Sequence, residues 1–213
     1  MSQGGYGTAI RANHRFVVPI PEGIRSEHAA SMLCAGLTMY SPLARQNVGP
    51  GSRVGIVGLG GLGHYGVLFA KALGAEVYAF SPDGAKEEDM KKLGADHYII
   101  ATEENMAPLA KTFDVILSTI DVVDDFPLRS YLGLLFVEGI FEDVVWVVPD
   151  RVKDQAIEMF KLALAKNIQP WVEIMPMSKL KEAVEGARAA KPRYRYVLVQ
   201  DLLPYNTSQG LKA

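Results

Sequence analysis

Short apolar runs alternate with amphipathic stretches along the middle of the chain, between residues 54 and 120. The apolar runs have the length of strands, and the stretches between them are about ten residues long and end at glycines such as Gly74 and Gly94. Strands alternating with helices predict a parallel sheet whose right-handed crossovers place helices on both of its faces. The predicted strands are 54–57, 77–80, 97–100 and 115–120, and the predicted helices are 62–73, 85–93 and 104–111.

The pattern is less regular on either side of this alternation. Residues 16–20 form a short apolar run with a proline at position 19, which is typical of an edge strand or an extended arm. Ser26 can cap one helical run, and a second helical run at 37–46 ends at the Gly-Pro-Gly of residues 49–51. Further along we expect helices at 128–135, 152–165 and 178–189, and strands at 144–148, 171–177 and 193–199.

Composition and charge exclude several classes of protein. A chain of 213 residues that is 49% hydrophobic can bury the core of one domain, or of one domain and part of another. The net charge of −2 gives no electrostatic reason to expect nucleic acid as a partner. There is no signal-peptide pattern, and no apolar run reaches the ~20 residues that a membrane helix needs. With one cysteine and therefore no internal disulfide, we expect a soluble cytoplasmic protein without nucleic-acid or membrane partners.

A glycine-rich loop follows the first predicted strand and opens the first helix of the alternation. Its sequence fits G-x-G-x-x-G in the context that dinucleotide-binding folds require. The first glycine allows a tight turn, the second lets the backbone approach a pyrophosphate, and the third lets helix and strand pack closely. The N–H groups at the helix start can then bind phosphate. The candidate cofactor-binding residues of this loop are Gly58, Leu59, Gly60, Gly61, Leu62 and Gly63.

The end of the second predicted strand bears on the choice of cofactor. NAD-binding folds carry an Asp or Glu there that holds the ribose 2′-hydroxyl, whereas this chain carries Ser81. The missing carboxylate and the nearby Lys86 favour NADP over NAD, although Asp83 and Glu87 flank the same lysine. The alternative for Lys86 is a solvated lysine at a helix start.

Two further groups of polar residues near the loop could take part in catalysis or ligand binding, but a purely structural role explains each of them. His64 directly follows the loop, where a packed or capping histidine is more common than a catalytic one. Asp121, Asp124 and Asp125 follow the strand 115–120 at the edge of the sheet where ligands bind in such folds, but a solvated loop explains them as well.

Several separated motifs occur in the order found in one known family. They are GGYGTAIRANHRFVVPIPEGI, HAASMLCAGLTMYSPL, GPGSRVGIVGLGGLGHYGVLFAKALGAEV, KKLGADHYI and PRYRYVLV. With these motifs the chain resembles the zinc-dependent medium-chain alcohol dehydrogenases, and within them the cinnamyl-alcohol-dehydrogenase-like, NADP-using branch. The resemblance implies an α/β fold with a Rossmann-type doubly wound parallel sheet and a remnant of a GroES-like, β-rich catalytic domain. Beyond the loop, Ser81 and Lys86, the candidate cofactor-binding residues are Thr38, Thr119 and Arg193.

The resemblance also raises the question of zinc, which polarises the substrate oxygen in this family. The family's ligands are an early cysteine, the histidine of a Gly-His-Glu motif, and a later cysteine that corresponds to Cys34. The other two ligands and the four-cysteine structural zinc lobe are missing from this sequence. Because one thiolate cannot hold a catalytic zinc, which needs about three protein ligands, we expect none. Another proton donor would then be needed, and the resemblance places Tyr40 near the nicotinamide, with helix packing as the alternative.

The resemblance further implies the organisation of the chain. We expect residues 1–35 to be a remnant of the catalytic domain, 36–169 the dinucleotide-binding domain, and 170–213 a return to the catalytic-domain remnant. The chain would then be a truncated member that also lacks about two dozen residues near 140–150. In the family that region completes the sheet edge and often builds the dimer interface. We therefore expect a homo-oligomer or an association with a partner chain.

Three functions are compatible with these observations. The first is an NADP-dependent oxidoreductase that works without zinc on aldehydes, alcohols or enones. The second is a non-redox protein that reuses the cleft, as an isomerase, a cyclase or a binding scaffold. The third is an inactive truncated isoform. The glycine loop favours the first function, and the missing ligands favour the other two.

Overall fold

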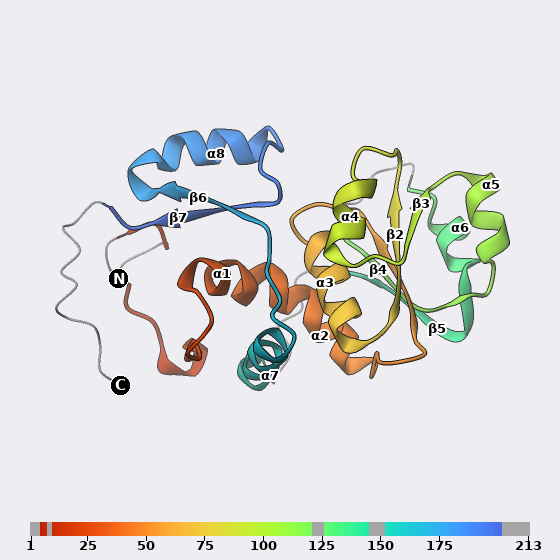
Figure 1. The fold of residues 1–213 in the computed structure, drawn as a ribbon, viewed down its shortest axis with the longest axis horizontal. Coiled ribbons are helices and arrows are strands. Elements are labelled where there is room, and N and C mark those ends of the chain that lie inside the picture. The colour runs from red at the N-terminus through yellow and green to blue at the C-terminus, as the bar shows by residue number, and fades with distance from the viewer. Residues whose placement is uncertain (1–4, 8–9, 121–125, 145–151, 202–213) are drawn as a thin grey trace.

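A five-stranded parallel sheet forms the centre of the computed structural model, which describes residues 5–7, 10–120, 126–144 and 152–201. The strand order is β3-β2-β1-β4-β5, so the direction of winding reverses between β1 and β4. Figure 1 shows the sheet with helices packed around it. The strands are β1 (Arg53–Val57), β2 (Glu76–Ser81), β3 (His97–Ile100), β4 (Phe113–Ser118) and β5 (Leu135–Asp143).

Helices cover both faces of this sheet, as the alternating sequence pattern predicts. On one face Ile56, Val77 and Leu117 pack in a core with residues of α2, α3, α4 and α7. On the other face Phe80 and Ile116 pack in a second core that includes residues of α5 and α6. This is the doubly wound arrangement expected from the sequence. The helices are α2 (Leu37–Arg45), α3 (Gly63–Leu73), α4 (Glu87–Leu93), α5 (Glu103–Met106), α6 (Leu128–Leu132) and α7 (Val152–Ala165).

The segment before the sheet is helical. A 3-10 turn at His14–Phe16 precedes α1 (Ser26–Ser31), which continues through the π-helical turn Met32–Gly36 into α2. Arg25 occupies the N-cap position that the sequence suggested for Ser26. Residues 10–35 contain no strand, so the β-rich character expected of the catalytic-domain remnant is not found in this part of the described chain.

A second, smaller sheet lies beside the first. Strands β6 (Val172–Pro176) and β7 (Arg195–Val199) pair in parallel, and α8 (Leu180–Arg188) connects them after a 3-10 turn at Met177–Lys179. In Figure 1 α8 lies on one side of this pair and α1 on the other, and both helices contact β7. The C-terminal part of the chain thus returns to pack on the segment that precedes the sheet.

The fifth strand of the large sheet differs from the expectation. The sequence suggested a helix at 128–135 and a strand at 144–148, whereas α6 ends at Leu132 and β5 spans 135–143. The run LLFVEGIF is apolar almost throughout, so its periodicity does not distinguish a helix end from a strand. Pairing with β4 decides the outcome, and the register shifts between Phe113 and Val115. Residues 145–148 lie outside the described part of the chain.

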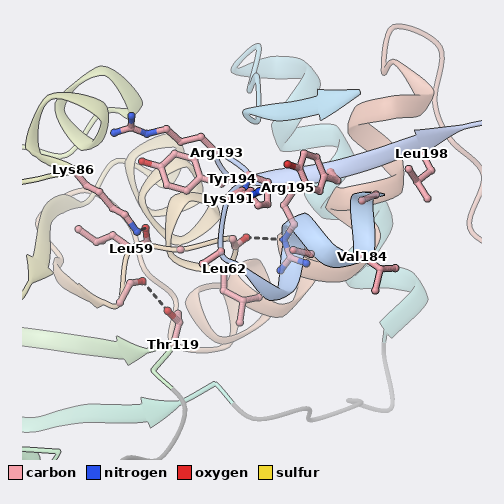
Figure 2. A pocket seen from close by; sticks show the side chains of 18 of the residues that line it. Leu59, Leu62, Lys86, Thr119, Val184, Lys191, Arg193, Tyr194, Arg195 and Leu198 are labelled. Atoms are coloured by element: carbon pink, nitrogen blue, oxygen red, sulfur yellow. Dashed lines mark hydrogen bonds between the residues drawn. The ribbon is translucent and has the colours of Figure 1, made fainter. Parts of the chain in front are cut away.

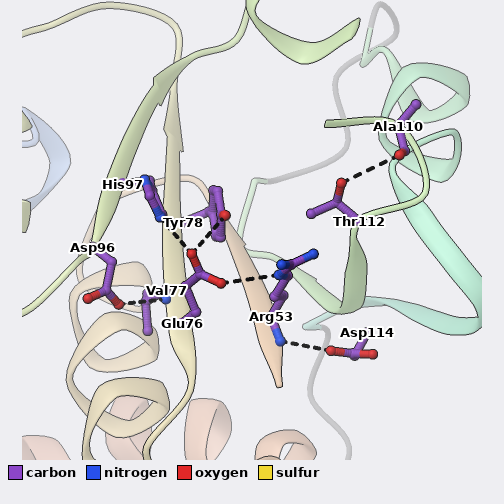
Figure 3. Close-up of polar contacts among 9 residues, drawn as sticks. All are labelled: Arg53, Glu76, Val77, Tyr78, Asp96, His97, Ala110, Thr112 and Asp114. Atoms are coloured by element: carbon purple, nitrogen blue, oxygen red, sulfur yellow. Dashed lines mark hydrogen bonds and ion pairs between the residues drawn. The ribbon is translucent and has the colours of Figure 1, made fainter. Parts of the chain in front are cut away.

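A polar network joins the strands at the edge opposite the glycine loop (Figure 3). Glu76 Oε1 accepts a hydrogen bond from the Tyr78 hydroxyl (3.1 Å) and lies 2.8 Å from His97 Nε2, while Oε2 accepts from Arg53 Nε (3.1 Å). The hydrogen bond with His97 is the main reason why the pKa of Glu76 is lowered. Because ligands bind at the carboxyl ends of the strands in such folds, this network at the amino ends is structural.

Candidate functional site

The glycine loop joins β1 to α3 in a tight turn. Gly58 has φ = +85°, which disfavours any side chain, and a Cβ there would lie 2.7 Å from Thr119 Oγ1. A Cβ at Gly63 would collide with the carbonyl oxygen of Gly58, so helix and strand approach closely only with glycine. By contrast, a Cβ at Gly60 would meet nothing within 4 Å. The open side of the loop is therefore at Gly60, where the motif expects a pyrophosphate.

Thr119 fixes the loop from the neighbouring strand. It directly follows β4, and its hydroxyl donates to the carbonyl of Gly58 (2.7 Å), with the Val57 carbonyl 3.2 Å away. Since β1 and β4 flank the point where the strand order reverses, this is the crevice in which open α/β sheets bind ligands.

Lys86 reaches the loop from the start of α4. Its ammonium donates to the carbonyl of Leu59 (2.8 Å) and lies 5.8 Å from the centre of the Tyr194 ring. The lysine that was predicted from sequence to face a ribose phosphate is thus already beside the glycine loop, with its charge above an aromatic face.

The C-terminal segment, residues 190–198, lies across the loop from the other side (Figure 2). Arg195 Nε donates to the carbonyl of Gly61 (3.1 Å). The ring of Tyr194 stacks on that of His64, with 5.1 Å between centroids and 11° between planes. His64 is fully buried, and its two ring nitrogens have no hydrogen-bond partner within the described residues. Burial therefore lowers the pKa of His64 to about 4, which keeps it neutral.

A cavity of about 890 Å³ separates the glycine loop from the C-terminal segment and α8. Four cationic side chains line it, and none of the lining residues that the structure describes is an aspartate or glutamate. Part of its wall is apolar and comes from α8. The cavity thus combines phosphate-binding backbone, positive charge and an apolar surface. The cations are Lys86, Lys191, Arg193 and Arg195.

Comparison with known proteins agrees with this geometry. Residues 61–131 match the family model described as "Zinc-binding dehydrogenase". The chain is 39% identical over 223 residues to NADP-dependent alcohol dehydrogenase 6 of Saccharomyces cerevisiae, an alignment covering 93% of this chain and 62% of the yeast protein. A cinnamyl alcohol dehydrogenase of Sorghum bicolor superposes with a TM-score of 0.75 at 28% identity, over 88% of this chain and 60% of that one. The chain belongs to the medium-chain alcohol dehydrogenase family.

A third relative is titled CAD from Helicobacter pylori, complexed with NADP(H). It has a TM-score of 0.66 at 26% identity, and the match covers 85% of this chain and 57% of that one. The chain therefore spans about three fifths of the length of these relatives. The yeast alignment is also longer than the 213 residues of the whole chain, so the yeast enzyme carries residues without a counterpart here. That they fall near 140–150 stays a prediction.

The structure brings most of the candidate cofactor-binding residues of this chain to one cavity. Gly63 lies directly behind the loop, at the start of α3. Ser81 ends β2 as expected, but it is buried and does not line the cavity. Thr38 lies elsewhere, with its hydroxyl donating to the carbonyl of Cys34 one helical turn earlier (2.9 Å). The candidates that line the cavity are Gly58, Leu59, Gly60, Gly61, Leu62, Lys86, Thr119 and Arg193.

The catalytic role expected for Tyr40 has no support from the geometry. Tyr40 is 7% exposed on α2, its ring packs edge-on against Phe69 at 5.5 Å, and it does not line the cavity. Burial raises the pKa of its hydroxyl, which makes a proton transfer from it still less favourable. Helix packing, the alternative weighed from the sequence, accounts for its position.

Sequence reasoning missed Arg195, which contacts the loop more directly than the predicted Arg193. The available signal was the alternation in RYRYVLV, because alternate residues of a strand point to the same side. Arg193 precedes β7, and its Nε pairs with Asp89 Oδ2 at 2.6 Å. Only the register of β7 against the loop shows which arginine reaches Gly61.

The residues described do not fit a zinc site. Cys34 is exposed on the π-helical turn. In the part of the chain that the structure describes, no group of three or more His, Cys, Asp or Glu side chains could hold a metal ion. Asp121, Asp124 and Asp125 lie outside the described residues. Among the residues that the structure does describe, no helix has the length and apolar character needed to cross a membrane.

Proposed function

We propose that this chain binds NADP(H) in the cavity and acts as an alcohol-dehydrogenase-like oxidoreductase that needs no zinc of its own. The observation that carries the proposal is the composition of the cavity, with a dinucleotide-type glycine loop on one wall, four cationic side chains and, among the lining residues that the structure describes, no carboxylate. A dinucleotide phosphate carries several negative charges, and such a site stabilises them. The names of the yeast and Helicobacter pylori relatives, which mention NADP, support the choice of cofactor.

The surroundings of Lys86 support NADP over NAD. The two acids that flank it in sequence have other partners, since Asp83 Oδ1 accepts from the backbone N–H of Ala85 (2.8 Å) and Glu87 pairs with Lys91 (2.6 Å). Lys86 itself donates to the Leu59 carbonyl and lies over the Tyr194 ring, and in the described chain it pairs with no carboxylate, so it can exchange the carbonyl for a phosphate. We infer that Lys86 binds the 2′-phosphate.

The other residues of the cavity would hold the remainder of the cofactor. The loop and the start of α3 would bind the pyrophosphate, and Arg195 would add a positive charge beside it. Leu180, Val184 and Leu198 give the cavity an apolar wall that excludes water. Bound NADP(H) supplies the hydride chemistry. The substrate class, an aldehyde, an alcohol or an enone, is proposed from the names of the relatives alone.

A binding role without redox chemistry is the second candidate. It is favoured by the position of Tyr40 away from the cavity and by the lack of a fitting metal-ligand group in the described chain. In that case the cavity would hold the dinucleotide without transferring hydride, as in a scaffold, a protein reused for isomerisation or cyclisation, or an inactive isoform.

A titration separates these possibilities. NADPH and NADH are added to the chain in separate calorimetric titrations, with zinc measured in the same sample and NADPH oxidation followed with a panel of aldehydes and enones. We expect NADPH to bind more tightly than NADH, without stoichiometric metal. Failure to bind either dinucleotide would refute the proposal, and binding without turnover would favour the scaffold.

Two lysine variants test the role of Lys86. Lys86→Ala should weaken NADPH binding about tenfold and leave NADH binding nearly unchanged, because only NADPH carries the 2′-phosphate. Lys92→Ala is the matched control, since Lys92 is an exposed lysine of the same helix paired with Glu88. Equal losses for both cofactors in Lys86→Ala would contradict the assignment.

We also propose that the chain associates with a second copy or a partner chain. Strand β5 ends the described sheet, and Phe136 and Val137 on it are 56% and 73% exposed. An exposed strand edge with apolar side chains favours pairing with another chain. Light scattering at high micromolar concentration tests the proposal, and a strict monomer without added partner would count against self-association.

A further inference from the structure

Asp89 is a nearly buried acid next to the cavity but not part of its lining. It lies on α4, its side chain is 12% exposed, and its Oδ2 accepts from the Tyr194 hydroxyl (2.8 Å) and from Arg193 Nε (2.6 Å). One carboxylate oxygen therefore holds two consecutive residues of the C-terminal segment. Charge-assisted hydrogen bonds of this kind are about twice as strong as neutral ones.

These bonds link the C-terminal segment to α4, in addition to the hydrogen bond from Arg195 to the Gly61 carbonyl. The backbone N–H groups of Arg193 and Tyr194 donate to Glu173 Oε1 (2.6 Å) and to the Trp171 carbonyl (3.2 Å), which both belong to the smaller sheet and its approach. These contacts shape the segment without placing it relative to the glycine loop. Asp89 does place it, because α4 packs on the large sheet.

Tyr194 transmits this placement to the loop. Its ring stacks on His64, the residue that follows Gly63, and Lys86 extends its ammonium over the same ring on the way to the Leu59 carbonyl. Burial and the neighbouring Asp89 carboxylate raise the pKa of Tyr194, so its hydroxyl remains a donor at neutral pH. A shift of Tyr194 would therefore alter the surroundings of Lys86 and of His64 together.

We propose that Asp89 is a positioning residue for the cavity, which holds Tyr194 and Arg193 so that Arg195 and Lys86 face one anionic ligand. This inference rests on the proposed function, because the ligand is taken to be NADP(H). Asp89 does not touch that ligand. It acts by fixing the distance between the loop and the C-terminal segment, so its loss would lower affinity without removing any ligand contact.

The test compares Asp89→Asn with a matched acid. Asp89→Asn keeps the shape but loses the charge that holds both donors. Asp96→Asn is the control. Asp96 also accepts hydrogen bonds from a lysine and a backbone N–H (Lys71 Nζ, 2.6 Å, and Val77 N, 2.9 Å), but it lies at the amino end of β3, away from the glycine loop. We expect NADPH affinity about tenfold lower in Asp89→Asn and within twofold of wild type in Asp96→Asn. Urea unfolding of both variants separates affinity from stability.

Two further measurements distinguish positioning from a general structural effect. Tyr194→Phe should weaken binding, and adding it to Asp89→Asn should cost less than the sum of the single changes, because both act through one hydrogen bond. Additive losses would contradict the proposal. Without any ligand, amide exchange of residues 193–195 should be about tenfold faster in Asp89→Asn, while that of α3 stays unchanged.

The exchange experiment also separates the two proposals. If wild type binds no NADPH but Asp89→Asn still speeds exchange at 193–195, the proposed function fails and the positioning role stands. If wild type binds NADPH while Asp89→Asn changes neither affinity nor exchange, the positioning role is overturned.

Discussion

The two walls of the cavity are built in different ways. The glycine-loop wall rests on β1 and β4, whose residues are almost all buried in a sheet covered on both faces. The wall formed by the C-terminal segment and α8 rests on the pair β6 and β7, where Ile174 and Val199 remain 49% and 41% exposed. The first wall presents backbone to a ligand, and the second presents side chains.

This difference shows which changes each wall tolerates. The loop wall depends on the absence of side chains at defined positions in a packed environment, so adding one methyl group is severe. The other wall has flexible side chains and more exposure, so its geometry depends on a few polar anchors to the rest of the chain. Substitutions in the loop wall should therefore lower the stability of the fold, whereas substitutions in the C-terminal segment should mainly disturb the positioning of the ligand.

The largest expected effect is at Gly63. Gly63→Ala would place a Cβ against the Gly58 carbonyl oxygen, where only backbone can move, and should destabilise the chain by more than about 3 kcal/mol. Urea unfolding measures this loss, and NADPH binding should disappear with the loop geometry. A near-wild-type midpoint for Gly63→Ala would refute the view that the loop wall is rigid.

A second effect concerns His64, which lies between the walls. Its pKa falls from 6.5 to about 4 in the folded chain, so the unfolded chain binds the proton more readily. The associated stability, about 3 kcal/mol at most, is complete above pH 6.5 and is lost as the pH falls toward 4. Urea unfolding between pH 7.5 and 4.5 should therefore show a steeper loss in wild type than in His64→Met. Parallel pH profiles would contradict a buried neutral histidine.

A smaller effect, confined to binding, is expected at Gly60. Because a Cβ there meets no atom within 4 Å, Gly60→Ala should fold with unchanged stability but project a methyl group toward the ligand. NADPH affinity should fall about tenfold, or about 1.4 kcal/mol. Calorimetry paired with urea unfolding checks both parts. A loss of stability equal to that of Gly63→Ala would erase the distinction between the two glycines.

The smallest effect is expected in the other wall. A Cβ at Gly186 of α8 would lie 2.9 Å from the Tyr196 ring, which can move because it belongs to a side chain. The better helix propensity of alanine offsets part of the clash, so Gly186→Ala should change the free energy of unfolding by less than about 1 kcal/mol. A loss above 3 kcal/mol would show that this wall is as rigid as the loop.

Local sequence predicted the large sheet well and its last strand poorly. Strand β3 and helix α7 have the predicted bounds, because each is a separate periodic segment with clear ends. Strand β5 was missed, because an edge strand with a continuous apolar run takes its form from pairing with β4. The sequence left two positions open for Tyr40, since a tyrosine on a helix can face a cleft or the core, and the structure packs its ring against Phe69.

The sequence by itself determined the glycine loop, because a strand, the three glycines of the motif and a helix start lie within a few residues of one another. It also determined the missing carboxylate at Ser81 and the presence of Lys86. Only the tertiary structure decided what faces the loop. Arg195 meets Gly61 across 134 residues and Asp89 meets Tyr194 across 105, and no local pattern encodes a pairing at such a separation. The second wall therefore exists only once the chain has folded back on itself.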